Sequence, residues 1–234
     1  MPGYVMHLAE AGLILEQLEK KRGRAYGQDW RNTFFLGTLL PDTKVGLEKY
    51  HTHFWQEEDI KKLPRAPHLS LFLEEYGECL SDPLILGYLA HLHLDNRYVK
   101  KYWPSVFRLW NDAGEETEDN DAITGVWITG QERLVERNAF FSKEWFYGDY
   151  SALNAYLIKR YQVQIPVYTQ DMRFPVSVKQ VQETDLTWLL DKLQRYLREE
   201  DGGLEPELRV LEIEGLERFL ENTANEFVMM GAGI

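Results

Sequence analysis

The chain has 234 residues, of which 44% are hydrophobic and 27% are charged, and its formal net charge is −12. This length and composition allow a sizeable core and exclude a disordered chain. The acidic excess excludes a broad nucleic-acid groove and attraction to an anionic membrane surface. The chain has no apolar run of about 18 residues, so we expect no membrane-spanning helix.

A single domain spanning residues 1–234 is expected. The amino-terminal residues lack the basic region and long apolar stretch of a signal peptide. The lone cysteine, Cys79, has no partner for an internal disulfide, which suits a reducing compartment. We therefore expect a cytoplasmic protein.

The first part of the chain shows helical patterns separated by clear breaks. Apolar residues at helical spacing, with glycine or proline at the ends, predict helices over 4–22, 28–40, 67–80 and 83–103. Residues 43–66 are expected to form a long loop, and loops of that length usually have a function.

The second part is also mostly helical in pattern. Helices are predicted over 122–141, 150–161, from 184 or 185 to 198, and 214–229, with an exposed acidic connection at 112–121. Alternating apolar residues predict strands or a hairpin within 162–182. The expected fold class is an all-α multi-helix bundle with a small irregular or β insertion around 162–182. Residues 1–103 would form a metal-site half and 104–234 a C-terminal helical half.

The pair His91 and Asp95 is the strongest indication of a functional site. Four residues apart on an apolar predicted helix, the two side chains project from one face. An imidazole and a carboxylate inside a core are costly unless something pairs them, and a divalent metal is one such partner. The alternative is an internal His–Asp pair. His93 lies about 200° round the helix from His91 and is expected to be structural or supporting.

Other possible ligands precede this helix, and all six histidines lie in the first 93 residues. His7 lies in the first turn of the first predicted helix. It is either a metal ligand or a core histidine whose ring nitrogens are hydrogen-bonded. Asp42 follows Pro41 and is a ligand, a general base or an ordinary turn residue. His51 and His53 alternate in the predicted loop, and one of them is a candidate ligand, with His53 favoured by the neighbouring aromatic residues.

Three cations follow Asp95 on the same predicted helix: Arg97, Lys100 and Lys101. They are candidates for holding a substrate phosphate. The alternative is a solvated helix end, which such charges commonly form.

The order of these residues resembles the zinc-dependent phospholipase C family. The resemblance rests on His7, on Asp42 in a Pro-Asp exit, on His53 in a His-Phe loop and on His91-x-x-x-Asp95. Segments 35–42 and 86–91 look like the intracellular bacterial members, and the likeness covers about residues 1–103. It implies an all-α fold of that family's type, with a metal cluster in a cleft between helices.

The resemblance also implies roles for individual residues. His53, His91 and Asp95 would share one metal, Asp95 would bridge to a second that also uses His7, and Asp42 would be the general base or a further ligand. The family's secreted members carry two more histidines and a glutamate downstream, whereas this chain has no histidine after His93. One or two ions are therefore expected, with zinc the natural choice and manganese or iron as alternatives.

These observations predict a hydrolase for a small phosphoester, with phosphodiesters favoured by the resemblance and with water activated by the metal and Asp42. A second possibility is a helical interaction module, with or without metal and without catalysis. A metal phosphohydrolase of the adjacent His-Asp type is disfavoured, because Leu94 separates His93 from Asp95.

Overall fold

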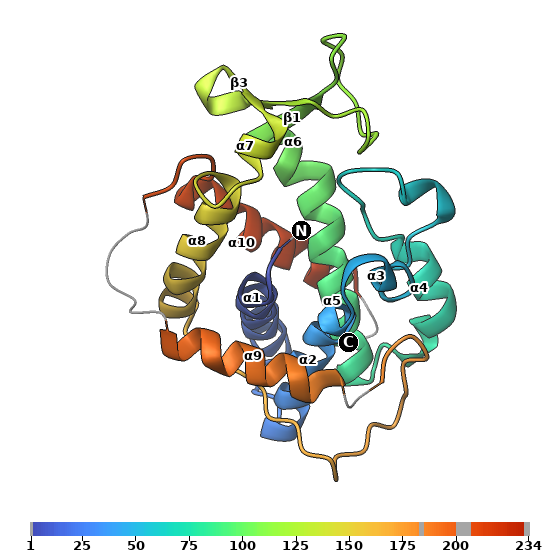
Figure 1. Ribbon diagram of the computed structural model, residues 1–234. Coiled ribbons are helices and arrows are strands. Elements are labelled where there is room, and N and C mark those ends of the chain that lie inside the picture. Colours follow the sequence, from blue (N-terminus) through green and yellow to red (C-terminus); the bar gives the residue numbers. More distant parts are fainter. Residues whose placement is uncertain (1, 183–184, 200–206, 232–234) are drawn as a thin grey trace.

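The computed structural model describes residues 2–182, 185–199 and 207–231, and it is mostly helical (Figure 1). Its helices are α1 (Tyr4–Arg22), α2 (Gln28–Leu39), α3 (Lys49–Thr52), α4 (Leu69–Tyr76), α5 (Pro83–Arg97), α6 (Trp103–Val106), α7 (Arg137–Phe140), α8 (Phe146–Tyr161), α9 (Asp185–Glu199) and α10 (Ile213–Met229). Its strands are β1 (Phe107–Trp110), β2 (Gly125–Ile128) and β3 (Arg133–Glu136). The mostly α-helical fold class is thus confirmed.

Helix α1 occupies the middle of the bundle and is seen almost along its axis in Figure 1. It contacts α2, α5, α8 and α10. The helix ends where Gly23 adopts a left-handed conformation with φ of 73°, and the Gly23 N–H donates to the carbonyl of Lys20. Its central position explains why two of its polar side chains, His7 and Glu10, are buried.

Helix α5 is buried almost along its whole length. Its start follows the sequence signals, because the Asp82 side chain accepts a hydrogen bond from the Leu84 N–H at 2.8 Å and Pro83 takes the first helical position. The chain stays helical past the predicted end at Trp103, through a π-helical turn at Tyr98–Tyr102 and then α6. Pro104 is tolerated because it stands in the first turn of α6.

Two glycines allow α2 and α5 to pack closely. A Cβ atom added to Gly37 would meet the Leu84 carbonyl oxygen at 2.1 Å, and one added to Gly87 would meet the Phe34 carbonyl oxygen at 2.1 Å. The two backbones therefore touch where any larger residue would hold them apart. This contact sets the position of His91, one helical turn after Gly87.

The sheet lies at one end of the bundle, at the top of Figure 1, and has the order β1-β2-β3. Both pairs are antiparallel, with Phe107 opposite Ile128 and Val126 opposite Val135. The predicted helix over 122–141 is therefore wrong, apart from the short α7. Val126 and Ile128 alternate toward the core at a spacing of two, the strand period, and this outweighed the helical spacing of the longer window.

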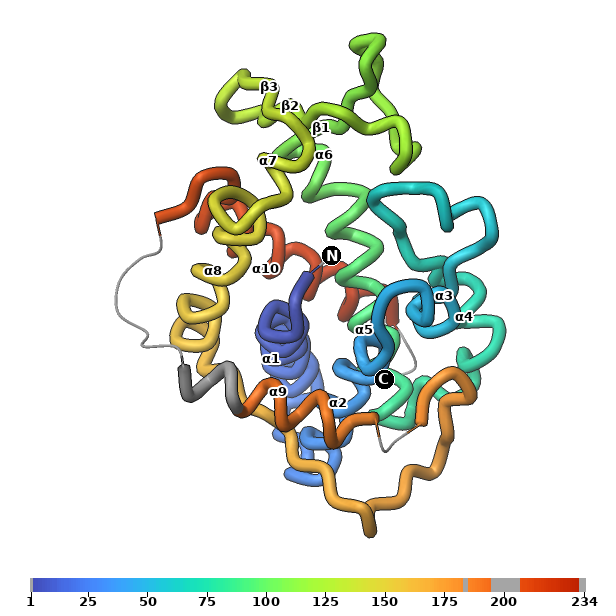
Figure 2. The backbone as a smooth tube through the Cα atoms, viewed as in Figure 1, coloured from blue at the N-terminus to red at the C-terminus, as the bar shows by residue number. Residues whose placement is uncertain are grey.

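The strands or hairpin predicted within 162–182 are also wrong. This segment contains no strand in the structure and loops round the lower end of the bundle in Figure 2 before the chain reaches α9. Its backbone is held by side chains instead: Asn32 binds the N–H and carbonyl of Val167, and the Tyr76 hydroxyl accepts from the Lys179 N–H. Apolar residues of this segment pack on the helical core. The alternation of apolar and polar residues therefore arises because one side of the segment is buried, and not because it pairs with another strand.

The predicted loop 43–66 includes short helical turns and α3. The helix predicted over 67–80 is shorter, as α4 covers Leu69–Tyr76. Thr184, one of the two possible starts for the helix over 184–198, lies outside the described residues. None of the helices within the described ranges is long and apolar enough to cross a bilayer.

Candidate metal centre

Five predicted ligands come together from four parts of the chain. His7 is on α1, Asp42 is in the helical turn that follows α2, His53 comes directly after α3, and His91 and Asp95 are on α5. Each of these residues is at most 4% exposed. The five residues thus form one buried polar cluster.

One group of ligand atoms comes from Asp42, His53 and His91, and these atoms all lie within 4.8 Å of one another. The His53 Nε2 atom is 3.4 Å from Asp42 Oδ1 and 3.4 Å from His91 Nε2. The His91 Nε2 atom is 3.9 Å from Asp42 Oδ1. Two imidazole nitrogens and a carboxylate oxygen thus face one point.

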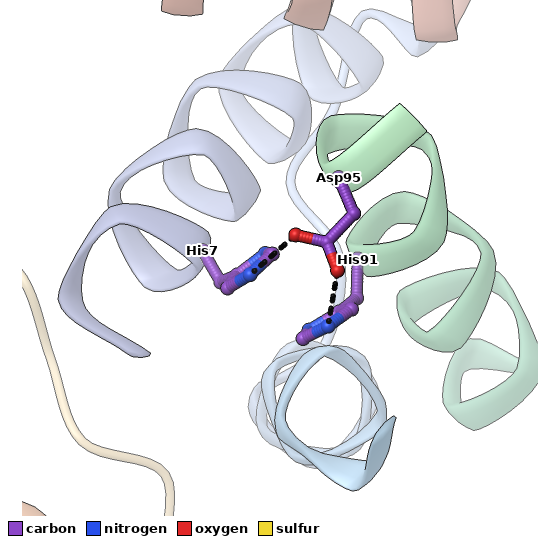
Figure 3. A group of neighbouring side chains, drawn as sticks. All are labelled: His7, His91 and Asp95. Carbon is purple, nitrogen blue, oxygen red and sulfur yellow. Dashed lines mark ion pairs between the residues drawn. The ribbon is translucent and has the colours of Figure 1, made fainter. Parts of the chain in front are cut away.

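A second group consists of His7, His91 and Asp95 (Figure 3). The Asp95 Oδ1 atom is 3.4 Å from His7 Nε2, while its Oδ2 atom is 3.5 Å from His91 Nε2 and 3.2 Å from His53 Nε2. The rings of His7 and His91 stack with centres 3.6 Å apart. Asp95 therefore directs Oδ1 toward His7 and Oδ2 toward His53 and His91.

These separations suit a shared cation better than a hydrogen-bond network. Good hydrogen bonds to nitrogen span about 2.7–3.2 Å. Nitrogen and oxygen ligands placed about 2.0–2.1 Å from a tetrahedral zinc ion would be about 3.3 Å apart. In addition, both ring nitrogens of His7 and both oxygens of Asp95 are buried without a hydrogen-bond partner. The two groups form a buried His/Asp cluster able to hold a metal ion.

Hydrogen bonds behind the ligands fix the orientation of two rings. His91 Nδ1 is 2.8 Å from the carbonyl oxygen of Thr38, and His53 Nδ1 is 3.0 Å from the Thr52 hydroxyl. A carbonyl oxygen only accepts, so Nδ1 of His91 carries the proton and Nε2 of the neutral ring keeps its lone pair for the cluster. Such outer partners are typical of metal-ligating histidines.

The electrostatics keep the carboxylates ionised. Burial raises the pKa of Asp42, but the charge of Lys49 and the contacts with His53 and His91 outweigh it and hold that pKa well below its usual value. In Asp95, burial is likewise outweighed by His91 and His53. Burial lowers the pKa of His91 to about 4, so its ring is neutral near pH 7. Anionic carboxylates and a neutral imidazole are the protonation states that metal binding requires.

His53 differs from His91. Burial lowers the pKa of His53, but its contacts with Asp42 and Asp95 reverse the effect and leave the pKa raised. In the metal-free chain this ring is the one best placed to carry a proton between the two carboxylates. A cation that enters the cluster would displace that proton.

The remaining sequence candidates lie outside the cluster. His51 is exposed, with its ring edge against Tyr50. His93 is buried beside Phe227 on another face of α5, as its position round the helix predicts.

Two of the three candidate phosphate-binding cations are paired with one carboxylate on α10. Arg97 and Lys101 contact Glu226 at 2.8 Å and 2.6 Å, whereas Lys100 is exposed.

Two residues near the cluster were missed by sequence reasoning. Lys49 forms an ion pair with Asp42 Oδ1, the oxygen that also faces His53 and His91. Glu10 is buried on α1, one turn after His7. Glu10 had a detectable signal, since it is an acidic residue inside an apolar helical run, but Lys49 reaches Asp42 only because α3 folds back onto the turn after α2.

A cavity of about 720 Å³ lies at the start of α1, and its lining includes Val5, two residues before His7, but none of the five cluster residues. Its walls include Tyr4, Trp103 and Tyr150, and two cations, Arg137 and Lys192, also line it. Burial and the charge of Asp42 raise the pKa of Tyr4 to about 12, and burial and, further, the charge of Asp95 raise that of Tyr150. Both tyrosines therefore lie close enough to the cluster for the charges of its carboxylates to affect their pKa values.

The chain was compared with known proteins at three levels. No family model matches it, and neither the curated proteins nor the solved structures contain a significant match. The interpretation of the site consequently depends on its own geometry.

Proposed function

We propose that this chain is a metal-dependent hydrolase of phosphoesters, of the zinc-dependent phospholipase C type, and that phosphodiesters are its preferred substrates. The observation that carries the proposal is the convergence of Asp42, His53, His91 and Asp95 at separations of 3.2–3.9 Å inside the buried core. The ligand order along the sequence supports the family type, and the nitrogen and oxygen donors favour zinc, with manganese or iron as the alternatives.

A bound zinc ion would polarise a phosphoryl oxygen and lower the pKa of water toward neutrality. His53, His91 and Asp95 would hold it, and Asp95 has a second oxygen free to face His7. Asp42, whose pKa is held well below its usual value, is a weak base. Its role is therefore better described as a ligand that also orients water than as a strong proton acceptor.

The cavity at the start of α1 supports binding of a small substrate. Its volume of about 720 Å³ is within the usual range for ligand sites. Arg137 and Lys192 supply positive charge in a chain that is acidic overall, which favours a phosphoester anion at this point. A small phosphoester enters here in our proposal, and nucleic acids and integral membrane partners play no part.

Complete burial of the ligands favours a second candidate function. Structural metal sites are closed, whereas catalytic sites keep a position open to water and substrate. His53, His91 and Asp95 are each 0% exposed. A metal-stabilised helical interaction module without turnover would have this property.

One experiment separates the two functions. Chelator-treated protein would be loaded with zinc, analysed for metal content and assayed on bis(p-nitrophenyl) phosphate. The proposal expects stoichiometric zinc with turnover, both lost in His91→Ala and both kept in His51→Ala, which removes an exposed histidine outside the cluster. Stoichiometric zinc without turnover of this or other phosphoesters would favour the interaction module, and absence of zinc from the wild-type chain would contradict both.

A further inference from the structure

Glu10 is a buried acid for which neither the fold nor the proposed reaction accounts. The residue is 1% exposed on α1, and its Oε1 atom is buried without a hydrogen-bond partner. Among the described residues it makes no ion pair with any lysine, arginine or histidine. Burying a carboxyl group without a partner is costly, so a group with no structural partner indicates a ligand that comes from outside the chain.

The surroundings of Glu10 increase this cost. Burial raises the pKa of Glu10 well above its usual value, and the negative charge of Asp95 raises it further. Asp95 is itself fully buried, and both its oxygens lack a hydrogen-bond partner. Glu10 stands one turn after His7, whose Nε2 atom lies 3.4 Å from Asp95 Oδ1. A divalent cation shared by the two buried carboxyl groups would offset the cost of burying them.

The helices place these groups in a pattern suited to two metals. His7 and Glu10 are three residues apart on α1, so they share a face, and His91 and Asp95 are four residues apart on α5. The two helices are in contact. Facing helices that each supply a carboxylate and a histidine are a recurring way to build a two-metal site in a helical bundle.

We propose that Glu10 is a ligand of a second divalent cation, which it holds together with His7 and Asp95. The proposal rests on the proposed metal centre, where His53, His91 and Asp95 hold the first ion and Asp95 turns its other oxygen toward His7. Glu10 is not among the ligand atoms of His7, His91 and Asp95 that lie within 4.8 Å of one another. Coordination by Glu10 therefore requires its carboxylate to turn toward His7 about its side-chain torsions. With two carboxylates and one imidazole, this position is harder in donor type than the first and accepts manganese as well as zinc.

The test counts ions in matched variants. Metal-free wild type, Glu10→Gln, Glu16→Gln and His91→Ala would each be titrated with zinc and with manganese, and bound metal would be measured by equilibrium dialysis with elemental analysis. Glu16→Gln is the control, because it makes the same change at an exposed position on α1. Circular dichroism melts of the metal-free proteins would confirm that each variant folds.

The expected result is two equivalents in wild type and Glu16→Gln, and one in Glu10→Gln, whose second ion would bind at least about 10-fold more weakly. Two equivalents of unchanged affinity in Glu10→Gln would overturn the role of Glu10 and leave the first site intact. If wild type and Glu10→Gln each bound one equivalent of metal, and His91→Ala bound none, the role of Glu10 would likewise be overturned and the first site would stand. No ion in wild type would instead overturn the metal centre and the proposed function.

A measurement on the unaltered chain keeps the proposal testable if Glu10→Gln does not fold. Crystals of wild type grown with manganese would give anomalous difference density at each bound ion. A peak bonded to His7, Asp95 and Glu10 is expected. A peak at His7 and Asp95 with Glu10 turned away would overturn the proposal.

Discussion

The Nδ1 atom of His91 on α5 lies 2.8 Å from the carbonyl oxygen of Thr38 on α2. This bond holds the ring so that Nε2 faces Asp42, His53 and Asp95. Thr38 directly follows Gly37, where the two helices touch. A backbone contact between α2 and α5 therefore sets the geometry of the cluster, and changes at that contact should affect metal binding without touching a ligand.

Replacement of Gly87 by alanine should test this link. The added Cβ would meet the Phe34 carbonyl oxygen at 2.1 Å, so α2 and α5 must separate. We expect the free energy of unfolding to fall by about 1–3 kcal/mol, the usual cost of overpacking, and zinc affinity to fall with it. Urea denaturation and zinc titration would measure both. Gly12→Ala is the control, because open space surrounds that helical glycine and alanine there should be neutral or slightly stabilising. Equal stability of the two variants would contradict the prediction.

Lys49 should act as a substitute for the metal. Its ammonium group pairs with Asp42 Oδ1 in the metal-free chain and competes with an ion for that oxygen. Lys49→Met should lower the free energy of unfolding of the metal-free protein by about 1–3 kcal/mol, because Asp42 loses its partner while buried.

The same variant should show a larger rise in melting temperature on zinc addition than wild type, because the competition is gone. Differential scanning fluorimetry with and without zinc would measure this rise. Lys44→Met is the matched control, since Lys44 pairs with the partly exposed Asp185 instead. A zinc response in Lys49→Met no larger than in Lys44→Met would argue against competition.

His93 should make the metal-free protein less stable in mild acid. Burial, together with the charge of Arg97, lowers the pKa of His93 to about 4, whereas the unfolded value is near 6.5. The unfolded chain therefore binds a proton below pH 6.5 that the folded chain resists, and stability falls as the pH drops from about 6.5 to 4. At pH 5 this one residue should cost about 2 kcal/mol.

The comparison that isolates His93 uses a leucine in its place. Urea denaturation at pH 7.5 and pH 5, with chelator present, should show a pH-dependent loss about 2 kcal/mol smaller in His93→Leu than in wild type. His51→Leu alters an exposed histidine and should leave the loss unchanged. Identical losses in all three proteins would show that His93 is not the group responsible.

The sequence was most informative where function depends on local geometry. His91 and Asp95 share a helix face because of their spacing alone, and Asp82 with Pro83 marks the start of that helix. The choice between His51 and His53 depended on whether the chain was extended or helical at that point. In the structure His53 ends the single turn of α3 and is buried in the cluster, while His51 is exposed.

Other features arise from contacts that no local pattern encodes. Thr38 supports His91 from 53 residues away in the chain. Residues 125–136 and 162–182 have similar alternating apolar patterns, yet the first segment pairs into a sheet and the second is held by Asn32 and Tyr76. Alternation reports which side is buried, and it does not report whether a partner strand lies alongside.

Filling the cavity should separate substrate access from metal binding. Ser151 is exposed on α8 and lines the cavity whose walls include Tyr4 and Tyr150. Ser151→Trp would place an indole in the space that the phosphoester needs, while every metal ligand stays in place. Turnover of bis(p-nitrophenyl) phosphate should fall on the order of 100-fold, a scale typical of misplaced reacting groups, with metal content unchanged. Ser70→Trp, at an exposed serine on α4 outside this cavity, should keep full activity. Full activity in Ser151→Trp would show that substrate reaches the cluster by another route, and loss of metal in that variant would show that the cavity wall supports the ligands themselves.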